Sequence, residues 1–279
     1  MPSLKYFRPK TIEEALSLLE QGSPLAGGTT LTPNRYRLDT VVDLQDLSLG
    51  ALESKADMLE AGAGCTLQQI VEADSLVPAA LADACRSEAA WNLRNMATLG
   101  GAVVTAAGGS TLAAALLALA AEVHSLPMDR WLPLDEYLEA RTPEAGHRLL
   151  TGFRWPSSST LRFIKVGRSP ADKPVILAAL GRTPDGAYRV VLGGWGPRPI
   201  RVLVAEQALA AGDAAGAGRA AAQACAAAGD AWASAEYRAE IAGVLVRRLA
   251  AEDNVPSEAR GAISREPRGK VPSEAKGKA

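Results

Sequence analysis

Two pairs of adjacent glycines constrain this chain more than any other feature. The first stands in PLAGGTTL (residues 24–31) and the second in RNMATLGGAVV (residues 94–104), each with threonine nearby. Glycine permits a positive φ and lacks the Cβ that would keep a ligand away from the backbone. Consecutive N–H groups in such turns form anion-binding concavities, and a threonine hydroxyl can add a donor. The pairs are either ordinary turns between strands or two loops that hold the phosphates of a dinucleotide, and the residues alone leave both interpretations open.

Neither pair matches a common nucleotide fingerprint. Neither follows the GxGxxG pattern of dinucleotide-binding folds, and neither continues into the GK[ST] of a P-loop. GAG at residues 62–64 lies between a predicted strand and a predicted helix, but no third glycine follows at the required spacing. We interpret GAG as packing at a strand end, and a Rossmann site and a nucleoside-triphosphatase site are both poorly supported.

The length and charge of the chain exclude several classes of protein. A chain of 279 residues is long enough for two domains, each with its own core. A formal net charge of −1 argues against a general attraction to nucleic acid. The first residues are amphipathic and carry acids, unlike a signal peptide, and the longest apolar run is too short to cross a bilayer. We therefore expect a cytoplasmic protein.

The cysteines and histidines do not predict a metal site or a catalytic triad. The three cysteines, Cys65, Cys85 and Cys225, are far apart and show no CxxC spacing, so we expect inert, buried thiols. The two histidines, His124 and His147, have no partner at ligand-like spacing.

The first half of the chain mixes predicted helices and strands, which implies an α+β or α/β domain. Capping boxes at Thr11 and Thr66 predict helices over residues 12–19 and 67–73, and Ser110 is a good N-cap for the apolar helix that follows. Residues 78–89 also read as helical. Residues 23–31 are predicted to be a short strand that ends in a glycine turn, and strands are predicted at residues 39–44 and 58–66. The second glycine pair is predicted to be a turn followed by a strand.

The second half begins after a Pro/Ser run at residues 156–160. Three strand-like segments (160–168, 174–181 and 187–196) precede three helical ones (202–212, 220–229 and 234–252). This order predicts an antiparallel sheet with helices on one face. From residue 253 the chain is rich in Pro, Ser, Glu, Lys, Arg and Gly, which indicates a disordered tail over 253–279.

Several of these motifs, in this order and spacing, resemble one known family. PLAGGTTLTP, VVDLQDL, LEAGAGCTLQQI and NLRNMATLGGAVV resemble the FAD-binding medium subunit of molybdenum hydroxylases, the xanthine dehydrogenase and carbon monoxide dehydrogenase family. FIKVGR, VVLGGWGPRPIRVLVAEQAL and SAEYRAEIAGVLVRRL resemble the C-terminal domain of that subunit. The resemblance extends to about residue 251.

The resemblance implies an α+β fold with two domains. Residues 1–156 would form an FAD-binding domain of the p-cresol methylhydroxylase type, with subdomains at about 1–55 and 56–156. Residues 157–252 would form the C-terminal domain of antiparallel sheet and helices, which closes over the flavin.

The resemblance also implies the cofactor and its site. The two glycine loops would bind the FAD pyrophosphate through backbone amides, and Lys165 matches a lysine that lies near the flavin in relatives, where a cation can stabilise a reduced ring. The implied FAD-binding residues are Leu25, Ala26, Gly27, Gly28, Thr29, Thr30, Leu31, Thr98, Leu99, Gly100, Gly101, Ala102, Ser110, Thr111 and Lys165.

Two positions depart from the family pattern. Ala102 stands where the family usually has asparagine, and Ser110-Thr111 stands where it tends to have Ser-Asp, whose acid contacts the FAD. Each lost contact is worth about 1 kcal/mol. The sequence therefore predicts weaker FAD binding than in relatives, or compensating groups elsewhere.

The function implied by the resemblance is electron transfer. The chain would be the flavoprotein subunit of an oxidoreductase complex, in which a large subunit carries molybdopterin and a small subunit carries [2Fe–2S] clusters. Electrons would pass from those clusters to NAD or another acceptor, and no side chain of this chain would act as a general acid, a base or a metal ligand. Two alternatives remain open: a stand-alone FAD oxidoreductase, and a scaffold subunit whose FAD binding is weakened or lost.

Overall fold

The N-terminal layer is a small parallel sheet. A computed structural model describes residues 4–33, 38–141, 149–169 and 172–253. The strand order is β1 (Lys5–Phe7), β3 (Thr40–Asp43) and β2 (Ser23–Leu25). Helix α1 (Ile12–Leu19) lies beside the sheet, and its buried Ala15 and Leu19 pack with Val42 of β3. The side chain of Thr11 accepts a hydrogen bond from the N–H of Glu14, which confirms the predicted start of this helix.

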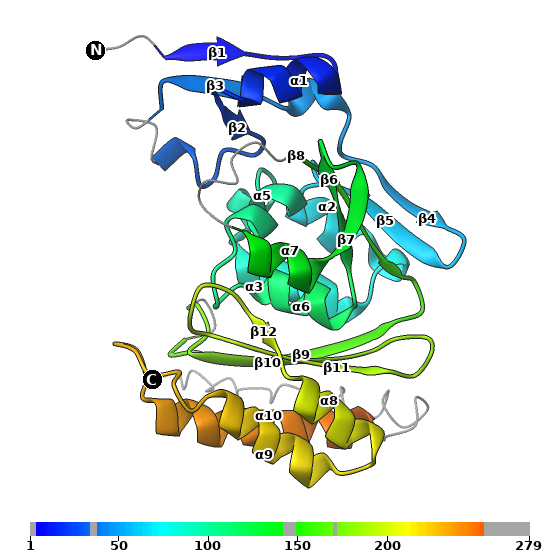
Figure 1. The fold of residues 1–279 in the computed structure, drawn as a ribbon, viewed down its shortest axis with the longest axis vertical. Helices are drawn as coiled ribbons and strands as arrows, with labels where there is room; N and C mark the ends of the chain where they lie inside the picture. Colours follow the sequence, from blue (N-terminus) through cyan, green and yellow to red (C-terminus); the bar gives the residue numbers. More distant parts are fainter. Residues whose placement is uncertain (1–3, 34–37, 142–148, 170–171, 254–279) are drawn as a thin grey trace, which may run out of the picture.

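The middle layer is a five-stranded antiparallel sheet with helices on one side (Figure 1). Its strand order is β4 (Leu52–Lys55), β5 (Met58–Gly62), β8 (Leu149–Pro156), β6 (Glu122–Leu126) and β7 (Arg130–Pro133). The helices are α2 (Leu67–Glu72), α3 (Ala79–Glu88), α4 (Trp91–Arg94), α5 (Leu99–Val104), α6 (Thr111–Ala118) and α7 (Leu134–Ala140). Short 3₁₀ helices, η2 (Gln45–Leu47) and η3 (Asp74–Leu76), lie between the strands and helices of this half.

Helix α6 is the centre of the main core. All of its residues are buried, as expected of a helix that is apolar on every side. It shares one core cluster with Leu59 and Phe153 of the middle sheet and with Leu177 and Val191 of the C-terminal sheet. A Cβ on Gly181 would lie 1.8 Å from the carbonyl oxygen of Ala118, so glycine lets the C-terminal sheet touch the helix backbone.

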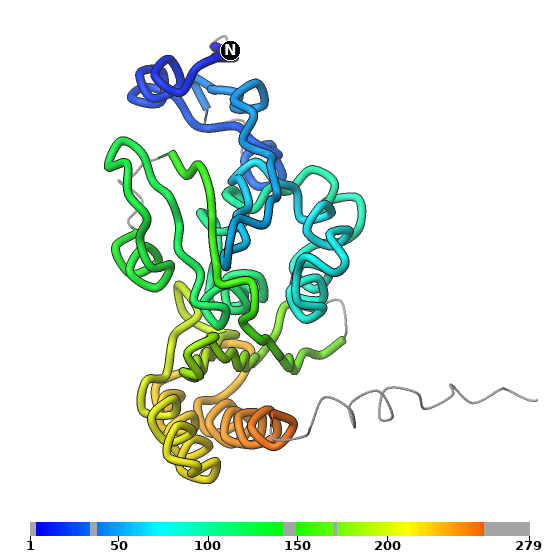
Figure 2. The backbone as a smooth tube through the Cα atoms, turned by 90° about the vertical axis from the view of Figure 1, so that its right-hand side faces the viewer, coloured from blue at the N-terminus to red at the C-terminus, as the bar shows by residue number. Residues whose placement is uncertain are grey.

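The C-terminal layers are a four-stranded antiparallel sheet and three helices. The strand order is β12 (Ile200–Arg201), β11 (Tyr188–Gly193), β10 (Ile176–Arg182) and β9 (Thr160–Val166). Side chains alternate along β10: Leu177 and Ala179 face α6, whereas Ile176 and Ala178 face the helices α8 (Leu203–Ala210), α9 (Ala214–Ala224) and α10 (Ala235–Asp253). Figure 2 shows these helices at the opposite end of the molecule from the N-terminal sheet.

A glycine-rich junction joins the C-terminal sheet to the loop before α6. The N–H of Gly108 donates to the carbonyl of Gly196 over 3.0 Å, and the N–H of Gly194 donates to the carbonyl of Gly108 over 2.7 Å. A Cβ on Gly108 would lie 1.6 Å from the carbonyl oxygen of Trp195. The two segments can therefore meet only through bare backbone.

The structure confirms the α+β fold class and most of the predicted elements. The strand predicted over residues 58–66 ends at Gly62, and the helix predicted over 220–229 is α9, which spans Ala214–Ala224. The type of one element is wrong: residues 99–104 form helix α5 and not a strand. The reason is the cap, because the Thr98 side chain accepts from the N–H of Gly101 and starts a helix in spite of the β-branched residues that follow. The predicted tail and His147 lie outside the described residues. The predicted domain boundary, which falls between β8 and β9, stays a prediction.

The predicted burial of the three thiols is confirmed. Cys65, Cys85 and Cys225 are free and buried. Burial raises the pKa of Cys65 and of Cys225 to about 11 and that of Cys85 to about 12, so these thiols stay protonated at neutral pH.

Candidate functional site

The structure brings both glycine loops to one cavity. This cavity, with a volume of about 750 Å³, lies between the N-terminal sheet and helix α5. The volume falls within the range of roughly 300–1,000 Å³ that is typical of small-molecule and cofactor sites. Of the predicted residues, the following line it: Ala26, Gly27, Gly28, Thr29, Thr30, Leu31, Thr98, Gly100 and Gly101.

The first glycine loop packs directly on the second. A Cβ on Gly27 would lie 1.7 Å from the carbonyl oxygen of Met96, so only glycine allows this contact. Gly28 has a φ of 69°, in the left-handed region that favours glycine. Its carbonyl accepts from the N–H of Thr32 over 2.9 Å and so closes the turn.

The first loop also offers unused backbone donors. Within the part of the chain that the structure describes, the N–H groups of Gly27, Gly28 and Thr29 donate to no other residue. Three consecutive free N–H groups beside a cavity can bind the oxygens of an anion.

Most of the backbone N–H groups of the second loop already donate to other residues of the protein. The N–H of Leu99 donates to the carbonyl of Cys65 and that of Gly100 donates to the carbonyl of Ala63, each over 2.8 Å. A Cβ on Gly100 would lie 2.9 Å from the Cβ of Ala63, whereas a Cβ on Gly101 would meet only the Thr98 hydroxyl, at 3.0 Å. Gly100 therefore serves packing between loops, and Gly101 keeps the cavity open. The predicted role of this loop in binding stays a prediction.

Three predicted residues beside the loops do not line the cavity. Leu99 is buried in the main core, and Ala102 packs against the same core. Leu25 ends β2, where its carbonyl accepts from the N–H of Leu44 over 2.9 Å.

Ser110 and Thr111 lie away from the cavity and face a carboxylate that the sequence did not predict. Oε2 of Glu88 accepts from the Ser110 hydroxyl (3.1 Å) and from the N–H of Leu112 (3.0 Å). The Thr111 hydroxyl lies 3.0 Å from the same oxygen and 2.8 Å from the carbonyl oxygen of Ala84. Glu88 thus places a negative charge at the start of α6, where the family tends to have aspartate. No sequence spacing links α3 to this position, so the pairing could not be predicted.

Lys165 is also away from the cavity. It lies on β9 on the same face as Leu161 and Phe163, which pack with α6, and opposite Leu177 of β10. Its predicted role near a flavin rests on the resemblance.

The remaining lining residues were not among the predicted site residues, although some of them lie in the motifs that carry the resemblance. One face of α5 contributes Val104 and Thr105, at helical spacing from Gly100 and Gly101. Leu44, Leu49, Leu149 and Leu150 make part of the wall apolar. No described lining residue carries a charged side chain, so an anion here would be bound by neutral donors.

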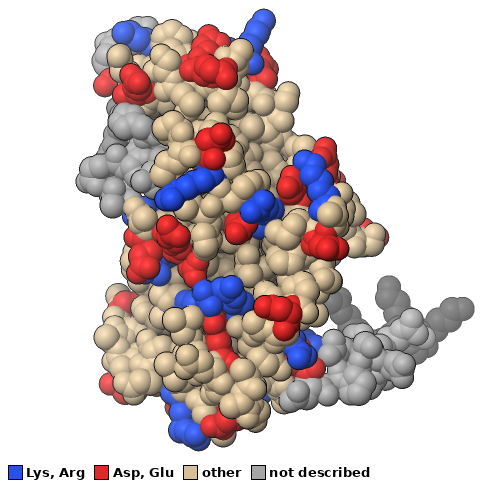
Figure 3. Space-filling view, turned by 45° about the vertical axis from the view of Figure 1, so that its right-hand side comes forward, with Lys and Arg blue, Asp and Glu red and all other residues tan. Residues whose placement is uncertain are grey.

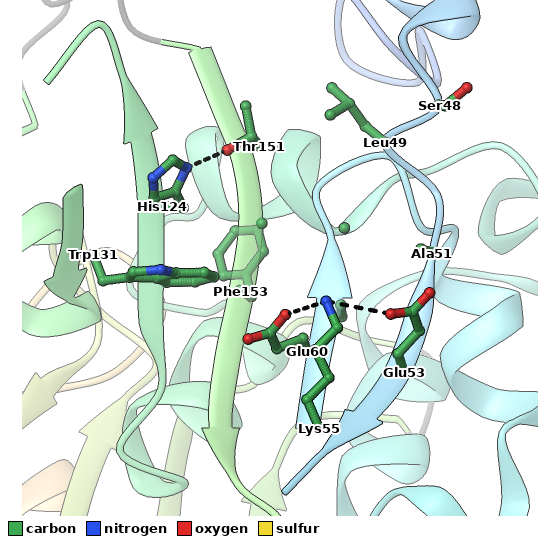
Figure 4. Close-up of a pocket in the computed structure, with 13 residues that line it drawn as sticks. Ser48, Leu49, Ala51, Glu53, Lys55, Glu60, His124, Trp131, Thr151 and Phe153 are labelled. Carbon is green, nitrogen blue, oxygen red and sulfur yellow. Dashed lines mark hydrogen bonds and ion pairs between the residues drawn. The ribbon is translucent and has the colours of Figure 1, made fainter. Parts of the chain in front are cut away.

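A smaller hollow of about 230 Å³ lies on the open face of the middle sheet, and its polar groups are paired (Figure 4). The Lys55 ammonium lies 2.8 Å from Glu60 and 3.3 Å from Glu53. Nδ1 of His124 lies 2.6 Å from the Thr151 hydroxyl, and its Nε2 lies 3.3 Å from Asp129. No predicted site residue lines this hollow, so the larger cavity is the candidate site.

Other kinds of site lack support. Acidic and basic side chains are interspersed on the face shown in Figure 3. Across the described ranges, no group of three or more His, Cys, Asp or Glu residues could hold a metal ion. No described helix is both long enough and apolar enough to span a membrane.

Comparison with known proteins decides the family. A family model described as "FAD binding domain in molybdopterin dehydrogenase" matches residues 2–158. The chain belongs to this family. Among relatives, it is 30% identical over 254 residues to the uncharacterized protein YgfM of Escherichia coli K12, covering 89% of this chain and 95% of YgfM. It is 29% identical over 229 residues to the xanthine dehydrogenase FAD-binding subunit of Escherichia coli O157:H7, covering 72% of this chain and 77% of the subunit.

Solved structures agree with this membership of the FAD-binding family. A chain of the Cu,Mo-CO dehydrogenase in its cyanide-inactivated form matches with a TM-score of 0.76 and 26% identity, covering 89% of this chain and 96% of that chain. A chain of quinoline 2-oxidoreductase from Pseudomonas putida 86 matches with a TM-score of 0.77 and 22% identity, covering 94% and 99% of the two chains, and shows the fold alone.

Proposed function

We propose that this chain is the FAD-binding, electron-transferring subunit of a multi-subunit molybdenum hydroxylase, with molybdopterin and [2Fe–2S] centres on partner subunits and NAD or another compound as the final acceptor. The observation that carries the proposal is the convergence of both glycine loops on one cavity that presents three unused backbone donors. Family membership and the similarity to a xanthine dehydrogenase FAD-binding subunit and to a chain of CO dehydrogenase support the same function.

The residues of the cavity fit an FAD pyrophosphate, with most of the binding on the first loop. We assign its oxygens to the N–H groups of Gly27, Gly28 and Thr29, with the Thr98 hydroxyl as a further donor. That hydroxyl accepts from the N–H of Gly101 and still has its own proton to donate. Hydrogen bonds to a charged group are worth about 1.5–3 kcal/mol each. These donors do not depend on position 102, so they offset the side-chain amide that an asparagine would supply there and that Ala102 lacks.

The rest of the cavity fits the ring systems and sugars of a dinucleotide. Leu44, Leu49, Leu149 and Leu150 supply apolar surface for a flat ring, and the side chains of Gln45, Ser48 and Asn95 supply hydrogen-bonding groups at the same cavity. FAD, when bound, supplies the redox chemistry. The side chains of this chain bind and orient it, and none is required to move a proton.

Metal and flavin analysis of the complex purified from its native source tests this function. We expect molybdenum, iron and FAD to elute together with the full-length chain, at fixed ratios. FAD without molybdenum or iron would overturn the proposal in favour of a stand-alone flavoprotein. Molybdenum and iron without FAD would overturn it in favour of a scaffold subunit.

A further inference from the structure

Arg141 makes a cluster of bonds that the predicted function does not use. It follows the last residue of α7, and its guanidinium is close to four backbone carbonyls. Nη1 donates to Val103 (2.8 Å) and Val104 (2.7 Å), and Nη2 donates to Ala106 (2.6 Å) and, at 3.4 Å, to Pro197. Burial lowers the pKa of Arg141 from its usual value, yet an arginine in a protein stays protonated.

These carbonyls belong to the end of a cavity wall. Helix α5 has only six residues, and its Gly100, Gly101 and Val104 line the candidate site together with Thr105, which caps its C-terminal end. The start of α5 is fixed by the bonds from Leu99 and Gly100 to the neighbouring loop. At its end, the carbonyl of Val103 accepts from the N–H of Ala106 over 3.2 Å, and Arg141 donates to this carbonyl and to that of Val104, the last residue of the helix.

The fourth carbonyl belongs to the C-terminal half of the chain. Pro197 directly follows Gly196, which accepts from the N–H of Gly108 at the glycine-rich junction. A single side chain thus ties the cavity wall to the loop of the C-terminal sheet. A lysine could not do the same, since it has one ammonium in place of a planar fork of five donors.

We propose that Arg141 is a positioning residue for the cofactor site: it holds the end of α5, and with it the wall formed by Val104 and Thr105, in place against the C-terminal sheet. This inference rests on the proposed function. Arg141 acts on affinity through α5, without touching the cofactor.

Titration of the full-length apoprotein with FAD tests the proposal in Arg141→Lys and Arg141→Met. We expect the Kd for FAD to rise at least tenfold in Arg141→Met, and to rise in Arg141→Lys as well. The matched control is Arg198→Ala. Arg198 pairs with Glu139 of α7 over 2.9 Å, at the same contact between the two halves of the chain, but neither residue lines the cavity. This control should lower the thermal midpoint with little change in Kd.

Hydrogen exchange of the apoproteins gives a readout that does not depend on FAD. We expect the amides of residues 104–106 to exchange at least tenfold faster in Arg141→Lys, with the amides of α10 unchanged. Unchanged exchange, or a Kd shift no larger than that of Arg198→Ala, would overturn the positioning role. If the wild-type chain bound no FAD, the proposed function would fall, and the affinity effect assigned to Arg141 would fall with it.

Discussion

The four glycines of the two Gly-Gly pairs have different structural roles, although they look equivalent in sequence. Gly27 and Gly100 allow two loops to pack backbone against backbone. Gly28 adopts a left-handed turn. Gly101 alone has open space on the side of the cavity. Three of the four therefore shape the site, and one leaves room for its ligand.

Alanine substitutions should separate these roles. Gly27→Ala places a methyl group 1.7 Å from a backbone carbonyl oxygen, which cannot move without the loop, so we expect a loss of about 1–3 kcal/mol in stability together with weaker FAD binding. Gly101→Ala meets only the Thr98 hydroxyl and gains helix propensity, worth up to about 1 kcal/mol.

Thermal unfolding and FAD titration of both variants check this prediction. The Gly101→Ala protein should keep or exceed the wild-type midpoint while its FAD affinity falls. Wild-type affinity in Gly101→Ala, or a wild-type midpoint in Gly27→Ala, would contradict the roles assigned here.

Sequence reasoning found the loops of the site but not all of its parts. Residues 26–31 and Thr98 stand in the motifs that carry the family resemblance, so they could be predicted as site residues, whereas the helix cap at Thr98 was not predicted. Leu149 and Leu150 line the cavity, and Glu88 bonds to the start of α6. These residues come from segments far away in the sequence, so only tertiary packing brings them to these places. Ser110 and Thr111 were correctly placed at the start of a helix, but their side chains bond within the protein.

At the scale of elements, a helix cap determined the secondary structure of a segment whose hydrophobic pattern suits either a helix or a strand. Residues 99–104 carry β-branched valines, and the prediction of a strand failed because the Thr98 cap and the bonds of the first turn favour a helix. Three of the four described strands of the C-terminal sheet, β9, β10 and β11, were predicted, whereas the two-residue strand β12 was not.

Helix α10 is anchored by a buried arginine. Arg238 is fully buried, pairs with both carboxylate oxygens of Asp230 at 2.9 Å, and donates to the carbonyls of Val175 and Ala228. These bonds fix the loop before the helix and one end of β10. Removing the guanidinium leaves buried acceptors without a donor.

We expect Arg238→Met to lower the free energy of unfolding by about 1–3 kcal/mol, the usual cost of leaving a buried acceptor without its donor. Urea unfolding measures the change. Arg248→Ala on the same helix is the control, because Arg248 is exposed and its pairing with Glu252 at 3.5 Å should contribute less than about 1 kcal/mol. Equal losses in the two variants would show that Arg238 is not an anchor.

At the scale of the whole molecule, the layers explain where the site lies. The N-terminal sheet supplies one loop and α5 supplies the facing wall, while α6 joins the middle and C-terminal sheets into one core. The sequence predicted the α+β class and many of the elements, but not the strands β1, β4 and β12. It could not predict the parallel pairing of β1 with β3, or the burial of α6 between two sheets, because these depend on contacts between residues far apart in the chain.

The most direct test of the central claim is the absorbance spectrum of the purified full-length chain, with chromatography of whatever denaturation releases. We predict oxidised-flavin bands as purified or after incubation with FAD, one FAD per chain, and release of FAD and not FMN. Colourless protein that stays colourless with excess FAD, alone and with its partner subunits, would contradict the assignment of this cavity to a flavin.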